Sequence, residues 1–275
     1  MSAPLLAAEG LSYAYPPRGS GARRAGAPAL VEVGFTLARG ETLALVGESD
    51  SGKSTIARIL AGLLVPSAGR LRYWRASGEA LELLTLAPRA RRRLQPEIGL
   101  VFQDPYQSLN PRHTVGEALA EPLLVHGRVR RAAARARARE LLERVGLEAG
   151  AAGRFPHEFS GGQRQRVAIA RALALAPRCL VLDEATSALD VSVRAQILNL
   201  LGDLQRELGL GYVFITHDLA LARVLAARTV VLAGGRVVES GATEEVLARP
   251  RHPATARLVA AVLSGDPSRR RSSGS

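Results

Sequence analysis

The amino-acid sequence predicts an α/β protein built on a parallel sheet. From residue 160 onward, helical periodicity alternates with short apolar runs, the pattern of successive strand–helix units. An earlier apolar run, residues 42–46, ends at a glycine, as a strand buried on both faces does. The 275 residues suffice for one sizeable core. The expected helices cover 162–175, 191–208 and 218–226, and the expected strands cover 179–183, 211–216 and 228–233.

The N-terminal third favours extended structure. We expect strands over 5–15 and 29–46, separated by a loop rich in Pro, Gly and Arg. A small antiparallel hairpin is expected over 70–86, after a helix with one apolar face over 54–64. Another buried strand is expected over 98–102. This part therefore predicts an antiparallel β subdomain beside the parallel core.

Helical periodicity dominates from residue 104 to about 160, which predicts a separate helical subdomain. Its Arg-rich stretch, residues 128–139, is interpreted as a solvated helix face rather than a binding site. Beyond the core we expect a C-terminal extension over 251–263 and a disordered, low-complexity tail over 264–275.

Composition excludes several classes of protein. No run reaches the roughly 18 apolar residues of a membrane span, and residues 1–10 lack the basic start of a secretory signal. The single cysteine, Cys179, excludes a disulfide framework and fits a reduced, cytoplasmic setting. The net charge of +12 invites a nucleic-acid partner. Because the arginines are scattered, that partner is disfavoured, and attraction to an anionic membrane explains the charge at least as well.

Lys53 is the single lysine in this arginine-rich chain, which indicates a role that needs a compact ammonium. It lies in a run that fits G-x-x-x-x-G-K-[ST] between a predicted strand and a predicted helix, the context of a phosphate-binding P-loop. A glycine turn without a phosphate-binding role would not explain why the strand, the loop, the lysine and the helix occur together in this order. Lys53 would bridge the β- and γ-phosphates of ATP, and Ser54 would ligate Mg²⁺. The predicted ATP-binding residues of this loop are Gly47, Glu48, Ser49, Asp50, Ser51, Gly52, Lys53, Ser54 and Thr55.

Two carboxylates end the predicted strand 179–183. Asp183 is expected to hold Mg²⁺, and Glu184 would point beyond the γ-phosphate and polarise the attacking water as a general base. An Asp-Glu pair after a strand is common, so it indicates ATP hydrolysis only together with the phosphate loop.

A second glycine-rich helix start follows Phe159. Ser160 is a good N-cap, and Gly161 and Gly162 allow a ligand close to the backbone ahead of Gln163. These features predict a second anion-binding helix N-terminus. The stretch resembles the signature motif of ABC ATPases, and it precedes the Asp-Glu strand as in that family.

The resemblance implies further roles for single residues. Gln103 matches the Q-loop, which contacts Mg²⁺ and the transporter, and Asp190 ends a match to the D-loop. His217, after a predicted strand, matches the switch histidine that partners the catalytic base. Tyr15 matches the aromatic that stacks on adenine, with Tyr13 as a rival.

The resemblance covers about residues 9–248. It implies a P-loop NTPase (RecA-like) core with an antiparallel β subdomain and an ABC-type helical subdomain. Together these would form a single ATP-binding domain over residues 5–250. In that family two subunits face each other head to tail, as a homodimer or with a sister ATPase. Each ATP would lie between one phosphate loop and the partner's signature and D-loop residues, here Ser160, Gly161, Gly162, Gln163 and Asp190. The implied partners are permease subunits and an external solute-binding protein, with the ATPase on the cytoplasmic face of the plasma membrane.

A narrower resemblance, carried by residues 101–112, 121–127 and 252–257, is to the ATPases of dipeptide, oligopeptide and nickel importers. It implies import of a peptide or metal complex, although Ala254 replaces a usual aromatic. The alternatives are a soluble ABC ATPase in phosphonate breakdown and one acting in DNA repair or translation.

Asp50 departs from the glycine usual in this group. A carboxylate there would either point to solvent without effect or weaken ATP binding by repelling phosphates.

Overall fold

The computed structural model describes residues 4–16, 27–87, 89–90, 94–104, 109–127 and 129–263. The chain divides into two compact units, one formed by Met1–Arg91 with Gly211–Ser275 and the other by Arg92–Leu210. The predicted loop between the first two strands lies largely outside the described residues, and the predicted tail over 264–275 lies entirely outside them.

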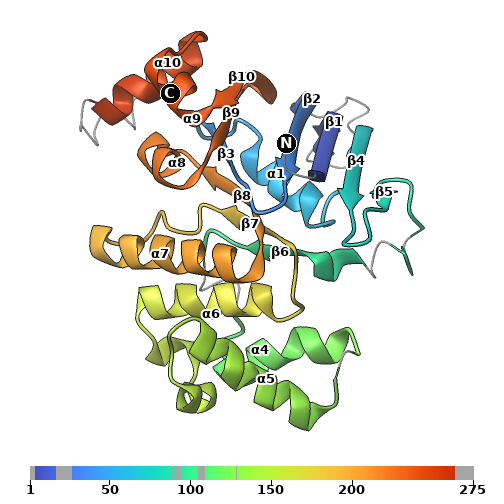
Figure 1. Cartoon of the computed structure of the whole chain (residues 1–275), viewed down its shortest axis with the longest axis vertical. Helices are drawn as coiled ribbons and strands as arrows, with labels where there is room; N and C mark the ends of the chain where they lie inside the picture. The colour runs from blue at the N-terminus through green and yellow to red at the C-terminus, as the bar shows by residue number, and fades with distance from the viewer. Residues whose placement is uncertain are drawn as a thin grey trace. The chain divides into compact units, whose positions relative to one another are not determined.

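The first unit contains an antiparallel sheet of four strands in the order β2-β1-β4-β5 (Figure 1). The strands are β1 (Pro4–Ala14), β2 (Pro28–Ala38), β4 (Ala68–Trp74) and β5 (Ala80–Glu82). Alternate side chains of β2 are buried, as expected where one face of a sheet packs on a core. The predicted antiparallel strands are thus present.

A second group of strands in the same unit surrounds β3 (Thr42–Gly47). This strand runs parallel to β8 (Gly211–Thr216) and β9 (Arg228–Ala233), and β10 (Arg236–Ala242) pairs antiparallel with β9. All residues of β3 and β8 are buried, in agreement with their uninterrupted apolar sequences. The described helices with full bounds in this unit include α1 (Lys53–Leu60), α8 (Leu219–Leu225), α9 (Thr243–Ala248) and α10 (Pro253–Leu263).

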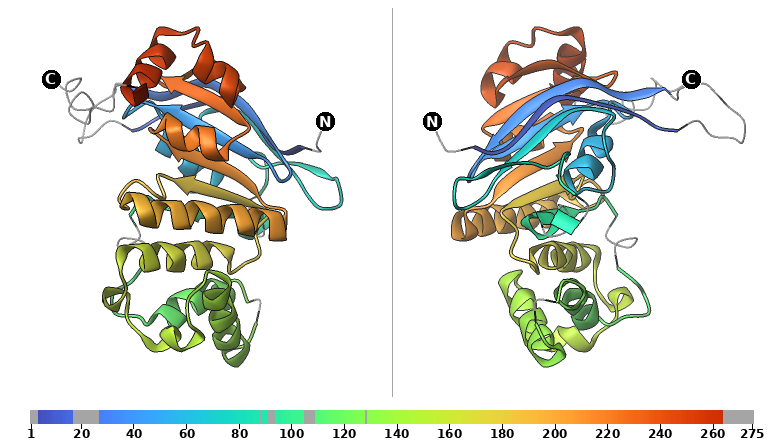
Figure 2. Two further views of the ribbon diagram at one scale, coloured as in Figure 1. Left: turned by 60° about the vertical axis from the view of Figure 1, so that its left-hand side comes forward. Right: turned by 90° about the vertical axis from the view of Figure 1, so that its right-hand side faces the viewer.

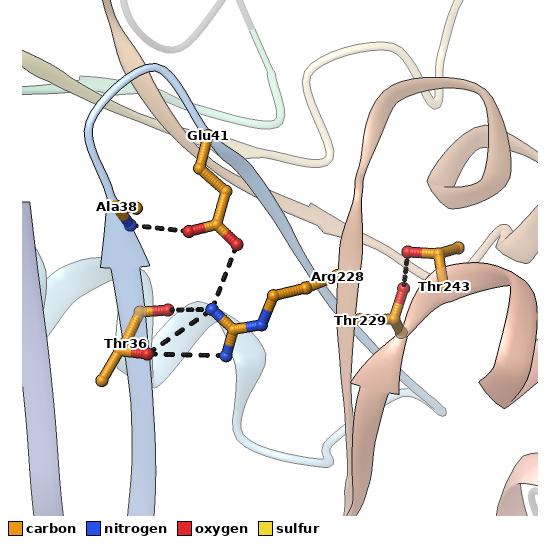
Figure 3. A network of polar contacts seen from close by, with 6 residues as sticks. All are labelled: Thr36, Ala38, Glu41, Arg228, Thr229 and Thr243. Atoms are coloured by element: carbon orange, nitrogen blue, oxygen red, sulfur yellow. Dashed lines mark hydrogen bonds and ion pairs between the residues drawn. The ribbon is translucent and has the colours of Figure 1, made fainter. Parts of the chain in front are cut away.

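The prediction of one strand over 29–46 is wrong. The chain turns after Ala38 through Gly40, whose φ is +67°, and β3 then begins in a different group of strands. Glu41 closes this turn (Figure 3): its carboxylate accepts hydrogen bonds from the backbone N–H of Ala38 at 2.6 Å and from Arg228 at 3.1 Å. Glycine and this network together override the strand propensity of the flanking residues.

The described part of the second unit contains parallel strands and several helices. Strand β6 (Ile98–Val101) pairs in parallel with β7 (Cys179–Asp183). The helices are α4 (Val115–Val125), α5 (Arg131–Arg144), α6 (Gly161–Leu173) and α7 (Val191–Leu208), and Figure 2 shows α6 and α7 lying side by side. Most arginines of α5 are exposed, as expected for a solvated helix face, whereas the opposite face is buried through Ala134, Ala138, Leu141 and Leu142. The boundaries 104–160 for a helical subdomain stay a prediction.

Within the described part of the chain, no helix is both long and apolar enough to cross a bilayer.

Candidate functional site

The predicted phosphate loop connects β3 to α1. Lys53, the first residue of α1, is only 5% exposed, and its ammonium donates to the backbone carbonyls of Gly47 at 2.9 Å and Glu48 at 2.6 Å and to Ser51 Oγ at 3.2 Å. The N-cap of α1 is Gly52, so no capping side chain competes for the first N–H groups of the helix. The loop therefore gathers an ammonium and a helix N-terminus, both of which attract phosphate.

Two glycines of the loop are required by close packing. A Cβ on Gly47 would overlap the backbone carbonyl oxygen of Leu232 and lie 2.6 Å from Ser51 Oγ. Gly52 has φ +101°, and a Cβ there would lie 2.6 Å from the carbonyl oxygen of Ala29. Only glycine allows the loop to lie this close to neighbouring backbone.

Asp50 has φ +60°, in the left-handed region that glycine adopts most easily, and its side chain is exposed. The conformation explains why a glycine would suit this position. This exposure is compatible with a carboxylate that points to solvent, and an effect of Asp50 on ATP binding stays a prediction.

Tyr15 is fixed through its hydroxyl to the helix that follows the phosphate loop. The hydroxyl lies 3.1 Å from Thr55 Oγ1 and accepts a hydrogen bond from Arg58 at 3.1 Å. Tyr15 is 38% exposed, and its ring forms a T-shaped contact with that of Tyr13, with centroids 5.0 Å apart. An exposed, tethered aromatic suits a stacking role, with Tyr13 supporting it from the side.

His217 lies at the same edge of the strands as the phosphate loop. It follows β8 directly, and Thr216 pairs with Val46, one residue before Gly47. The backbone N–H of Asp218 donates to Thr216 Oγ1 at 2.9 Å, which turns the chain just after the histidine. Parallel pairing therefore brings the histidine and the phosphate loop to one edge.

In the second unit, Gln103 and Glu184 are brought together. Val101 of β6 pairs with Leu182 of β7, so the residues that follow both strands emerge at one edge. Gln103 Nε2 donates to Glu184 Oε2 at 3.1 Å. Glu184 has φ +47°, an uncommon conformation for a non-glycine residue that concentrates at functional sites. Asp183, the last residue of β7, is 8% exposed.

The glycine-rich start of α6 is closed by a capping box. Ser160 Oγ accepts from the backbone N–H of Gln163 at 3.3 Å, and Gln163 Oε1 accepts from the backbone N–H of Ser160 at 2.9 Å. A Cβ on Gly162 would overlap a methyl group of Val193 on α7, whereas one on Gly161 would find its nearest neighbour at 3.9 Å. Gly162 is thus required for helix packing, and Gly161 leaves room beside the backbone.

Arg164 anchors the turn that precedes this helix start. The side chain is 7% exposed and donates to the carbonyls of Pro156 at 2.6 Å and His157 at 3.1 Å. Both carbonyls belong to a 3-10 turn, Pro156–Glu158, that ends two residues before Ser160. The sequence prediction missed Arg164, because an arginine after a signature-like run looks like any other solvated cation.

Asp190 caps α7. Its carboxylate accepts from the backbone N–H of Val193 at 2.9 Å and from the hydroxyl of Ser192 at 2.8 Å, and these hydrogen bonds lower the pKa of Asp190 below its usual value. The residue therefore has a structural role in the chain itself, and a contact with the partner's ATP stays a prediction.

Comparison with known proteins decides the family. The family model described as ABC transporter matches residues 30–187 of this chain, which is more than half of its length. The chain belongs to the ABC transporter family. The resemblance to ABC ATPases is thereby confirmed, and the roles of the single residues in the phosphate loop, the start of α6 and the Asp-Glu strand stay predictions.

Two solved cassettes of the family are similar over most of this chain. One is the dimeric ATP-binding cassette MJ0796 bound to ADP and Pi, with 31% identity, a TM-score of 0.74, and coverage of 87% of this chain and 99% of that one. The other is cbiO1 from Clostridium perfringens, part of the ABC transporter complex cbiONQ, with 31% identity, a TM-score of 0.75, and coverage of 90% and 92%. Both confirm the predicted fold class.

Curated relatives include the glutathione import ATP-binding protein GsiA of Escherichia coli (strain K12) and that of Shigella boydii serotype 4. Each is 50% identical over 243 residues, which is 88% of this chain. The chain spans about two fifths of the length of these relatives, 38% in each case. They are importer proteins, so the alternative of an ABC ATPase without a permease is not favoured.

Proposed function

We propose that this chain hydrolyses ATP to energise a membrane importer for small peptides or metal complexes. The observation that carries the coupling to import is the 50% identity, over 88% of the chain, to proteins named for glutathione import. Glutathione is itself a small peptide, so these relatives support the peptide class more than the nickel class.

The phosphate loop would bind the triphosphate. Lys53 already donates three hydrogen bonds within its own loop, to two carbonyls and the hydroxyl of Ser51, so its ammonium is held where phosphate oxygens can replace those acceptors. Tyr15 would stack on the base, because its ring is exposed while its hydroxyl is tethered.

Glu184 is the proposed general base. Its carboxylate follows a fully buried strand, and the hydrogen bond from Gln103 fixes its direction, so it can accept a proton from a water placed for attack. His217 is the proposed partner of this step. Ser54, Gln103 and Asp183 are the proposed Mg²⁺ ligands, since hydroxyl, amide and carboxylate oxygens are the donors that this hard cation takes. When bound, Mg²⁺ would neutralise the charge of the phosphates during transfer.

We further propose that a second cassette, either another copy or a sister ATPase, contributes Ser160, Gly161, Gly162, Gln163 and Asp190 to each ATP. The proposed partners are permease subunits and an external solute-binding protein, with the cassette at the cytoplasmic face of the plasma membrane.

The test of hydrolysis is the variant Glu184→Gln. It should bind ATP, form a stable dimer on size-exclusion chromatography and lose at least about 100-fold in turnover, as expected when a general base is removed. Normal turnover of this variant would assign the base to another residue. The test of import is purification from detergent-solubilised membranes: recovery of integral permease subunits supports the proposal, and recovery of soluble metabolic enzymes or nucleic acid instead contradicts it.

A further inference from the structure

The C-terminal helix α10 packs within the first unit close to β3, the strand that leads into the phosphate loop. Its partly buried side chains Leu258 and Val259 pack against a core cluster that contains Ala44 and Val46 of β3. The helix therefore rests on the strand that positions the phosphate loop.

The start of α10 is also fixed by hydrogen bonds. Glu239 on β10 accepts from the backbone N–H of Arg251 at 3.1 Å and from that of His252 at 3.1 Å. Nδ1 of His252 accepts from the backbone N–H of Ala254 at 3.2 Å, and Ala254 and Thr255 are buried. These contacts fix both the position and the rotation of the helix, so the direction of its exposed side chains is determined.

One exposed side chain of α10 reaches the phosphate loop itself. Arg257 Nε lies 3.2 Å from Oε1 of Glu48, the second residue of the loop. Glu48 and Asp50 together bring two negative charges into a loop whose own cation is Lys53. Phosphate oxygens bound there would be repelled by both carboxylates unless a second cation offsets one of them.

We infer that α10 is part of the nucleotide site and that Arg257 sets its affinity for ATP by neutralising Glu48. Arg257 acts as a positioning residue: it holds the Glu48 carboxylate toward the C-terminal helix and reduces its repulsion of the triphosphate. The inference rests on the proposed binding of ATP to this loop.

The electrostatic origin predicts both the size and the salt dependence of the effect. The side chains of Arg257 and Glu48 are 63% and 51% exposed, so their interaction is weak and screened. Removing the Arg257 charge should raise the dissociation constant for MgATP about two- to fivefold at low salt. The difference should largely vanish at 0.5 M salt, where the screening length is only a few ångströms.

The experiment is a double-mutant cycle on the full chain, with binding of MgATP measured at 20 mM and 0.5 M salt. Arg257→Gln should weaken binding, Arg257→Lys should restore it, and Glu48→Gln should bind at least as tightly as the native chain. In the Glu48→Gln background, Arg257→Gln should have no further effect, because the charge that it compensates is gone.

The matched control is Arg223→Gln. Arg223 forms an ion pair of the same kind in the same unit: its Nε lies 3.0 Å from Oε1 of Glu244, and the two side chains are 64% and 67% exposed. Equal effects of Arg257→Gln and Arg223→Gln, or an undiminished effect of Arg257→Gln in the Glu48→Gln background, would overturn the inference. Failure of the native chain to bind MgATP, or binding that survives Lys53→Ala, would instead contradict the proposed function.

Discussion

Arg164 is expected to decide whether the start of α6 can take part in a dimer. In Arg164→Ala the carbonyls of Pro156 and His157 lose donors at 2.6 and 3.1 Å from a side chain that is 7% exposed. A hydrogen bond to a charged donor contributes about 1.5–3 kcal/mol, so losing two weakens the turn by roughly 3–6 kcal/mol. Opening of that turn would then become roughly 100-fold or more as frequent.

The assay separates a local effect from general unfolding. Amide hydrogen exchange should speed up over residues 156–163, and ATP-dependent dimerisation in the Glu184→Gln background should be lost. Binding of MgATP to the monomer should remain, because Lys53 and its loop belong to the other compact unit. The control is Arg166→Ala on the same helix, which removes one hydrogen bond, to the carbonyl of Val145 at 2.7 Å.

Three outcomes would refute this reasoning. Unchanged exchange over 156–163 in Arg164→Ala would show that the two carbonyls do not hold the turn. Equal loss of dimerisation in Arg164→Ala and Arg166→Ala would reduce the effect to general destabilisation of α6. If Arg164→Ala lost MgATP binding by the monomer to the same extent as dimerisation, the start of α6 could not be treated as independent of the phosphate loop at the start of α1.

Three further predictions concern other parts of the chain. Asp50→Gly and Asp50→Asn should both tighten MgATP binding by at most about fivefold at low salt, as measured by titration. Each variant removes an exposed charge whose repulsion of a phosphate is about 1 kcal/mol at 4 Å in water. Weaker binding in both variants would mean that the Asp50 carboxylate assists binding of MgATP. Burial raises the pKa of the Cys179 thiol to about 12, so at pH 8 roughly one thiol in 10⁴ is ionised. A thiol-specific reagent should therefore label the chain only after denaturation. Rapid labelling of the native protein would contradict this prediction. Gly47→Ala should abolish nucleotide binding or folding, because its Cβ would overlap the Leu232 carbonyl oxygen. The control is Gly34→Ala, whose Cβ would find its nearest neighbour at 3.5 Å. This variant should fold, with a change in the free energy of unfolding of about 0.5 kcal/mol or less in urea.

Much of the fold could be predicted because local patterns were strong. The strands β7, β8 and β9 and the helix α7 have the predicted boundaries, since the strands are continuous apolar runs and the helix is a long amphipathic one. The strand over 29–46 was predicted wrongly, because Gly40 lies between two runs that both favour strand and only the contacts of Glu41 fix the turn. The strand β10 and the helices α9 and α10, of 7, 6 and 11 residues, were not predicted.

The sequence by itself determined the family of the molecule and predicted its chemistry. The phosphate loop around Lys53, the Asp-Glu pair after β7 and the Ser-Gly-Gly-Gln helix start are contiguous, so spacing along the chain was enough to recognise them and to predict an ABC cassette. Tertiary structure alone decided which distant residues support those motifs. Arg257 meets Glu48 across 209 positions, Gln103 meets Glu184 across 81, and Tyr15 meets Thr55 across 40. Such pairs leave no periodic signal, because they arise from the pairing of strands and the docking of helices and not from neighbouring residues.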